Sequence, residues 1–222
     1  MARKKLDKHD LKEDPLLDFF MRAYEYIKTH QNVVFVGLIA LIIIVAGSFW
    51  YRNSREAARI SAANRFSEAN MLYYSGDTRS ASQVFELVRD NYGGTREGAY
   101  ASYYLGKISN GQGEYTGAIE HFLNYLKKAD DFPFFRKAAH ISIAVALEND
   151  RQFEKAAGKY LEIAEELSED DDKRAKYLRK SAECYALADM DGRAVEIYRK
   201  ALPYMKDLAA RQIEVKIDIL SR

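Results

Sequence analysis

Four segments of the chain repeat one pattern, an alanine followed four residues later by an aromatic residue. The pairs are Ala81/Phe85, Ala118/Phe122, Ala156/Tyr160 and Ala194/Tyr198. Successive alanines lie 37, 38 and 38 residues apart. A generic helical bundle has no need of a constant period, whereas stacked repeats require one. The pattern therefore predicts an array of similar units stacked along the chain.

Two further sets of positions keep the same period. Another small residue lies twelve positions before each alanine, and an apolar or small residue lies three positions after each aromatic. The first set is Ala69, Gly106, Ala144 and Ala182, and the second is Val88, Tyr125, Ile163 and Ala201. Turn-forming residues such as Gly76 and Gly113 separate the two small positions, so each unit should be a helix, a tight turn and a helix. Small residues allow antiparallel helices to approach closely, and the aromatic is expected to fill the groove toward the next unit.

Composition agrees with an all-helical chain and limits its chemistry. Only three prolines interrupt 222 residues, and alanine, leucine, lysine and glutamate are plentiful. The formal net charge is +1, which argues against nucleic-acid binding. The single cysteine, Cys184, excludes an intrachain disulfide and a cysteine-based zinc cluster. Small half-buried side chains suit its position, so we expect a structural role for it.

The second copy of the pattern resembles the tetratricopeptide repeat family. It contains the Leu105-Gly106 pair, followed by a Gly-x-Tyr-x-x-Ala-x-x-x-Phe run from Gly113 to Phe122. The period is longer than the family's usual value of about 34 residues, and the first and third copies lack the Leu-Gly pair. The resemblance implies an all-α, TPR-like right-handed helical solenoid of about four repeats plus a C-terminal capping helix.

A charge-free apolar segment of nineteen residues precedes the repeats, from Val33 to Tyr51. A helix of roughly 20 residues crosses the hydrocarbon core of a bilayer. Trp50 and Tyr51 lie where an aromatic belt is expected, and Lys28 and Arg52 flank the segment. Because 32 residues precede it, an uncleaved signal anchor is favoured over a cleaved signal peptide. A buried core helix is the remaining alternative.

The charges on the two sides of this segment give conflicting indications of its orientation in the membrane. Residues 1–32 contain seven Lys and Arg, but only Arg22 and Lys28 lie close to the segment, whereas four arginines follow it from Arg52 to Arg65. A long C-terminal domain can cross a membrane largely regardless of charge, so we expect a cytoplasmic N-terminus. Asp14-Pro15 predicts the start of a short amphipathic helix at the membrane surface, and a linker with some helical content is the alternative.

These features divide the chain as follows. We expect an N-terminal cytoplasmic tail with a short amphipathic helix over 1–32, a transmembrane signal anchor over 33–51, a TPR-like solenoid over 56–206 and a capping helix over 207–222. The solenoid would hold repeats at about 62–98, 99–136, 137–174 and 175–206. In the last helix, Leu208, Val215 and Ile219 are expected to form the apolar face of the cap.

This arrangement resembles the single-span ancillary subunit family of the bacterial Sec translocon. The resemblance implies an inner-membrane protein whose solenoid is extracytoplasmic. It also implies a chaperone-like or holdase function, with translocon subunits, a membrane-anchored prolyl isomerase and newly exported chains as partners. A structural adaptor of a cell-envelope or division complex is the alternative function.

The sequence offers candidates for binding but not for catalysis. None of the four histidines lies in a metal-binding motif, and no phosphate loop is present, so we expect a non-enzymatic protein without catalytic, metal or cofactor sites. In TPR solenoids the first helices of successive repeats line a concave groove for proteins or peptides. The residues expected to be exposed there are Phe66, Asn70, Tyr73, Tyr100, Tyr103, Lys107, Asn110, Glu148, Lys176 and Arg179. Tyrosines suit such a groove, although half of them could instead pack between repeats.

Overall fold

The computed structural model describes residues 15–167 and 171–222, and within these residues it is helical, without a strand. The predicted all-α solenoid is therefore confirmed. The chain divides into two compact units, residues 1–57 and residues 58–222. They are described separately below.

Among its described residues, the N-terminal unit consists of one whole helix and the first part of a second. Helix α1 spans Pro15–Thr29, so a proline occupies its first turn as predicted, while Asp14 lies outside the described residues. Phe20, Tyr24 and Ile27 are exposed along α1. Asp18 and Arg22 form an ion pair one turn apart, with 3.1 Å between Oδ2 and Nη2. The helix is thus amphipathic.

Helix α2 spans Gln31–Ser75 and contains the apolar segment. Among the described residues it is the one helix that is long and apolar enough to cross a membrane by length and composition, and no residue of its apolar window is buried there. The same helix continues into residues 58–75, where Ala62 and Ala69 are buried. No proline or glycine between Gly47 and Gly76 interrupts it.

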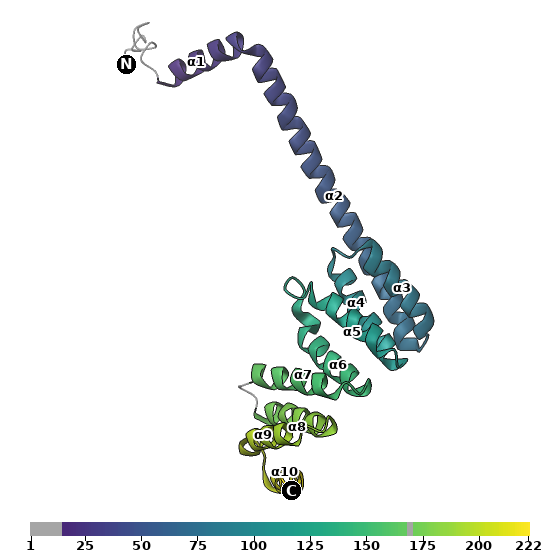
Figure 1. Cartoon of the computed structure of the whole chain (residues 1–222). Coiled ribbons are helices and arrows are strands. Elements are labelled where there is room, and N and C mark those ends of the chain that lie inside the picture. Colours follow the sequence, from purple (N-terminus) through teal and green to yellow (C-terminus); the bar gives the residue numbers. More distant parts are fainter. Residues whose placement is uncertain (1–14, 168–170) are drawn as a thin grey trace, which may run out of the picture. The chain divides into compact units, whose positions relative to one another are not determined.

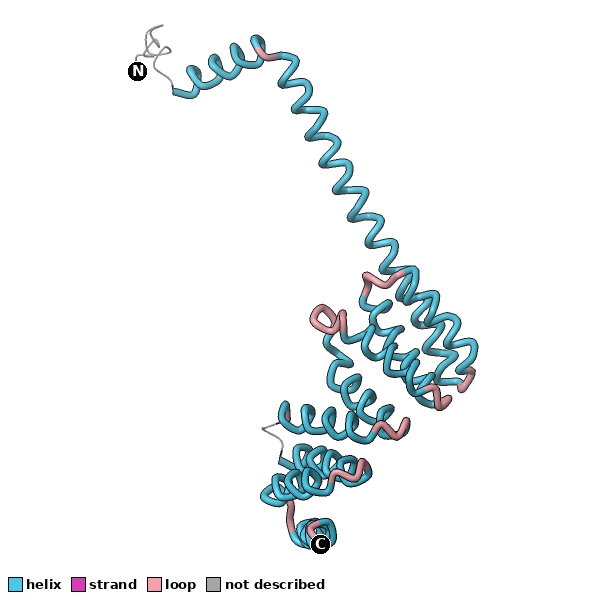
Figure 2. Tube along the Cα trace, in the orientation of Figure 1, coloured by secondary structure: helices cyan, strands magenta, loops and turns pink. Residues whose placement is uncertain are grey.

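The C-terminal unit is a stack of helix pairs in chain order (Figure 1), and a short loop joins the two helices inside each pair (Figure 2). After the end of α2 its helices are α3 (Thr78–Asn91), α4 (Arg96–Gly111), α5 (Tyr115–Leu126), α6 (Arg136–Asn149), α7 (Phe153–Glu166), α8 (Asp171–Leu187), α9 (Asp191–Ala201) and α10 (Asp207–Leu220), with short 3-10 helices η1 (Pro133–Phe135) and η2 (Leu202–Tyr204). The helices α4, α6 and α8 begin one to four residues before the repeat starts expected from the sequence.

One backbone conformation recurs in the turn inside every pair. Gly76, Gly113, Arg151 and Asp189 all have positive φ, between 57° and 91°, and they are 37, 38 and 38 residues apart. The residue that follows Gly113, Arg151 or Asp189 donates its amide to the carbonyl five residues before it, as Gln152 N–H does to Leu147 C=O at 2.9 Å. This is the Schellman ending of a helix, which needs a left-handed residue. The repeat is therefore encoded in the backbone as well as in the core.

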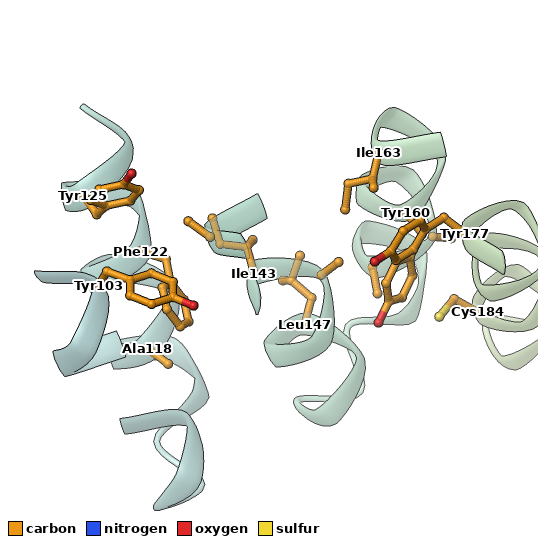
Figure 3. Packing of buried hydrophobic residues seen from close by; sticks show 14 of the residues in the cluster. Tyr103, Ala118, Phe122, Tyr125, Ile143, Leu147, Tyr160, Ile163, Tyr177 and Cys184 are labelled. Carbon is orange, nitrogen blue, oxygen red and sulfur yellow. The ribbon is translucent and has the colours of Figure 1, made fainter. Parts of the chain in front are cut away.

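The pattern alanines and aromatics form the core. All eight are at most 1% exposed, and the small residues Ala69, Ala144 and Ala182 are fully buried. At Gly106, a Cβ atom would lie only 2.7 Å from two ring carbons of Phe122. The aromatic thus packs on the small residue of its own repeat. Figure 3 shows Phe122 beside Tyr103, and Tyr160 beside Tyr177 and Cys184.

Helix α10 is amphipathic, but its packed face differs from the expected one. Ile213 is buried, and Ile217 and Leu220 pack against the core, whereas Leu208 and Val215 are exposed. The helix has two apolar faces, and the last repeat selects the face that carries Ile213.

Candidate protein-binding face

Aromatic side chains connect the first helices of the first two repeats. The ring centroid of Phe66 on α2 lies 5.7 Å from that of Tyr104 on α4, and Tyr73 lies 5.4 Å from the same ring. Both contacts are edge-to-face, the arrangement that ring quadrupoles favour. We call this set the aromatic cluster: Phe66, Tyr73, Phe85, Tyr100, Tyr103, Tyr104, Tyr125, Phe134 and Phe135.

The loop before α6 covers part of this cluster. Phe135 stacks on Tyr103 with centroids 4.3 Å apart, and Tyr103 is only 8% exposed. The Tyr125 hydroxyl fixes the loop, because it donates to the Phe132 carbonyl at 2.7 Å and accepts from the Phe135 amide at 2.9 Å. The sequence predicts that Tyr103 is exposed, but the structure buries it because Phe135 lies over its ring.

Lys107 lies at the edge of the cluster. Its ammonium is 5.1 Å from the ring centroid of Tyr73 and 5.8 Å from that of Tyr104. Burial lowers the pKa of Lys107, but hydrogen bonding and attraction from Tyr73 outweigh burial and raise it overall. The side chain is exposed and charged, so it can also meet a partner.

The first helices of the later repeats are linked by ion pairs. Glu148 on α6 contacts Lys180 on α8, with 2.9 Å between Oε1 and Nζ, and it also accepts from the Tyr160 hydroxyl at 2.6 Å. One repeat further on, Glu183 on α8 pairs with Lys216 on α10 at 2.9 Å. Each lysine also lies over the aromatic of the preceding repeat, as Lys180 does over Tyr160. We call Glu148, Lys180, Glu183 and Lys216 the charge ladder.

The ten candidate residues fall into three groups. Seven lie on α2 and α4, in or beside the aromatic cluster: Phe66, Asn70, Tyr73, Tyr100, Tyr103, Lys107 and Asn110. Glu148 belongs to the charge ladder, and Arg179 joins it through Glu183 at 3.0 Å. Lys176 is exposed on α8, apart from both sets.

Two asparagines in the first group have an unusual environment. The Oδ1 atoms of Asn70 and Asn110 are buried without a hydrogen-bond partner in the described structure. An unpaired buried acceptor is costly. Neither oxygen is reachable without a rotation of its side chain.

Several residues of this face were missed from the sequence. Phe134 is 77% exposed, yet its ring lies 4.8 Å from Phe135 and 6.3 Å from Tyr100. Phe132, Phe134 and Phe135, three aromatic residues around Pro133 between two repeats, were an available signal. The charge ladder also left a signal in the sequence. Glu148 and Glu183 are 35 residues apart, and Lys180 and Lys216 are 36 residues apart, which is close to the repeat period.

The remaining titratable groups of interest are buried in the stack. Burial, with a smaller contribution from the Glu148 charge, raises the pKa of the Cys184 thiol to about 12. Burial also lowers the pKa of His121, and the Arg89 guanidinium lowers it further. Within the described ranges, no group of three His, Cys, Asp or Glu side chains could hold a metal ion.

Repeated helix pairs with a periodic core define a helical repeat solenoid, a class of protein that typically binds other proteins. The chain matches the tetratricopeptide repeat-like domain over residues 25–222, and it belongs to that family. No curated protein matches it. Among solved structures it is similar to BtubC (BKLC) from P. vanneervenii, with 17% identity, a TM-score of 0.49 and coverage of 75% of this chain and 82% of that one.

Proposed function

We propose that the chain is a non-enzymatic, membrane-anchored scaffold that binds proteins or peptides on the first-helix face of its solenoid. TPR-like domains commonly bind proteins or peptides, which supports the class of function. The observation that carries the binding site is the exposed rim of the aromatic cluster. There Phe134 and Lys107 are exposed beside the half-buried Tyr73 and Tyr100.

The chemistry of this rim indicates what it would bind. Aromatic rings provide large apolar area at little cost in side-chain entropy. Lys107 adds a positive charge held against two rings. An extended segment with apolar side chains and an acidic group fits this rim. Tyr103, although a candidate, acts from beneath as support for Phe135.

The membrane anchor is part of the same proposal. Residues 33–51 cross the bilayer, the N-terminus is cytoplasmic, and the solenoid lies outside the cytoplasm at the inner membrane of a bacterium. The length and apolar composition of α2 support the anchor. The amphipathic α1 would lie at the membrane surface, with its apolar side chains among the lipids.

Within this frame we assign the chain a chaperone-like role as an ancillary factor of the Sec translocon. Its support is the arrangement of tail, span and solenoid along the sequence. Translocon subunits, a membrane-anchored prolyl isomerase and newly exported chains are the expected partners. A structural adaptor of a cell-envelope or division complex would use the same face for one fixed partner.

Crosslinking in cells followed by capture of the tagged full-length protein tests the assignment. Translocon subunits or exported chains are expected in the adducts. A Lys107→Ala/Phe134→Ala variant should lose most of them, while a Leu123→Ala/Lys127→Ala control, altered at exposed positions on and just after α5, should keep them. Recovery of cytoplasmic soluble enzymes alone would contradict the proposal.

Two further measurements separate the alternatives. Depletion that alters cell shape while export of secreted proteins stays normal would favour the adaptor. Protease access to residues 56–222 in intact and permeabilised cells tests orientation. If the solenoid stays protected from protease when only the outer membrane is permeabilised, it lies in the cytoplasm, and the translocon role is excluded.

A further inference from the structure

Helix α10 carries an apolar face that nothing in the described structure covers. Leu208, Val215 and Ile219 are 68%, 59% and 63% exposed, while Ile213, on the other side of the helix, is 2% exposed. A helix that is apolar on two sides normally buries both. The second face therefore lacks its packing partner.

The spacing of this face is that of a helix–helix seam. Leu208, Gln212, Val215 and Ile219 follow one another at intervals of four, three and four residues. This alternation places the four side chains on one stripe, as at the core positions of a coiled coil. We call these four residues the α10 stripe.

Charges along one edge of the stripe indicate what fits it. Arg211 and Asp218 lie seven residues apart, each directly before a stripe residue. In an antiparallel pair of identical helices, such edge positions face each other, so Arg211 of each copy would meet Asp218 of the other. In a parallel pair, Arg211 would instead face Lys216 of the other copy, which is a like-charge contact. The pattern is self-complementary in one direction only.

The surface next to the stripe has room for a partner side chain. A depression of about 440 Å³ is lined by Leu187, Ile219 and Leu220, together with Ala186, Tyr198 and three charge-ladder residues, Glu148, Glu183 and Lys216. Antiparallel pairing about the middle of the stripe would bring Leu208 of the second copy opposite Ile219. That leucine would then lie at this depression, where Leu187 is 57% exposed.

We propose that two copies of this chain form a homodimer through antiparallel packing of their α10 stripes. Gln212 faces Val215 of the second copy near the twofold axis, and Arg211 pairs with Asp218 on one edge. Asp218 already contacts Arg222 of its own chain at 3.0 Å, but both side chains are largely exposed, so this contact can give way. The surface buried between two helices of this length is small. Anchoring of both copies in one membrane would strengthen the dimer by raising their effective concentration.

The mass of the purified full-length protein in detergent micelles, measured by native mass spectrometry over a range of concentrations, tests the proposal. The wild type should show twice the 25.5 kDa of one chain at high concentration. Val215→Asp should give one chain, and Leu87→Asp, which alters an exposed leucine on α3, should still give two. A monomeric wild type, or a dimer that survives Val215→Asp, would overturn it.

A charge exchange tests the direction of the pairing without altering apolar packing. Arg211→Asp and Asp218→Arg should each weaken dimerisation several-fold, because each places like charges opposite each other. The double variant should restore the wild-type dissociation constant, since it re-forms both pairs with their signs reversed. A double variant as weak as the two single variants together would refute the antiparallel arrangement.

Discussion

Replacement of Gly106 by alanine probes the packing that defines the repeat. The added Cβ would lie 2.7, 2.7 and 2.9 Å from three ring carbons of Phe122. Ordinary contact begins near 3.4 Å, so the ring must move by about 0.7 Å. Phe122 is only 1% exposed, so the ring would have to move within the packed core. Overpacking of this kind costs about 1–3 kcal/mol.

Helix propensity acts in the opposite direction at this position. Alanine is favoured over glycine by about 1 kcal/mol inside a helix, so Gly106→Ala should destabilise the fold by about 0–2 kcal/mol in total. Gly158, inside α7, is the matched control, because a Cβ there meets nothing within 4 Å. Gly158→Ala should therefore stabilise by about 1 kcal/mol. The difference between the two variants isolates the contact with Phe122.

Urea unfolding of the full-length protein in detergent, followed by circular dichroism, measures both variants. Phe122→Leu provides the second side of a double-mutant cycle, since a smaller side chain leaves room for the new methyl group. The cost of Gly106→Ala should shrink in that background. If Gly106→Ala stabilises as much as Gly158→Ala does, the small residue has no packing role and the reasoning is refuted.

Three further predictions concern the turns and the buried titratable groups. Arg151→Gly should stabilise the fold by about 0.5–1 kcal/mol in urea unfolding. Relief of the left-handed conformation at Arg151 is worth about 1–2 kcal/mol, and it exceeds the cost of the added entropy of the unfolded chain, about 0.5–1 kcal/mol. A destabilised variant would contradict this. The pKa of His121 is lowered in the folded state, so the unfolded state binds more protons and stability should fall as pH drops below about 6.5, with a smaller fall in His121→Gln. If the melting temperatures of the wild type and of His121→Gln fell by the same amount between pH 8 and pH 5.5, this contribution would be excluded. With its pKa raised to about 12, the Cys184 thiol should resist alkylation at neutral pH until denaturant is added, and rapid labelling of the native protein would show that the thiol is accessible.

The periodic features of the fold were predictable because they are local. The alanine and aromatic positions follow from helix packing inside one repeat, and Gly76 and Gly113 mark two of the turns directly. Arg151 and Asp189 adopt the same left-handed conformation without a glycine signal. There the two flanking helices impose the conformation, so composition alone could not reveal it.

Features that depend on distant segments were not predictable. Tyr103 is buried because the loop ending at Phe135 folds over it, and no pattern around Tyr103 encodes that contact. The Glu148–Lys180 pair depends on how one repeat is rotated on the next. In α10 both faces are apolar, and the surface of the preceding repeat decides that Ile213 packs inward.

Site-specific photo-crosslinking in cells tests most directly whether the first-helix face binds other proteins. A benzophenone-bearing phenylalanine would replace Phe134 at the rim of the aromatic cluster, and separately Leu123 on α5, which is 45% exposed. The account predicts discrete adducts of defined mass from position 134, lost when Lys107 is also changed to alanine, and few adducts from position 123. Equal adducts from both positions, or adducts from position 123 alone, would contradict the claim that this face is the binding surface.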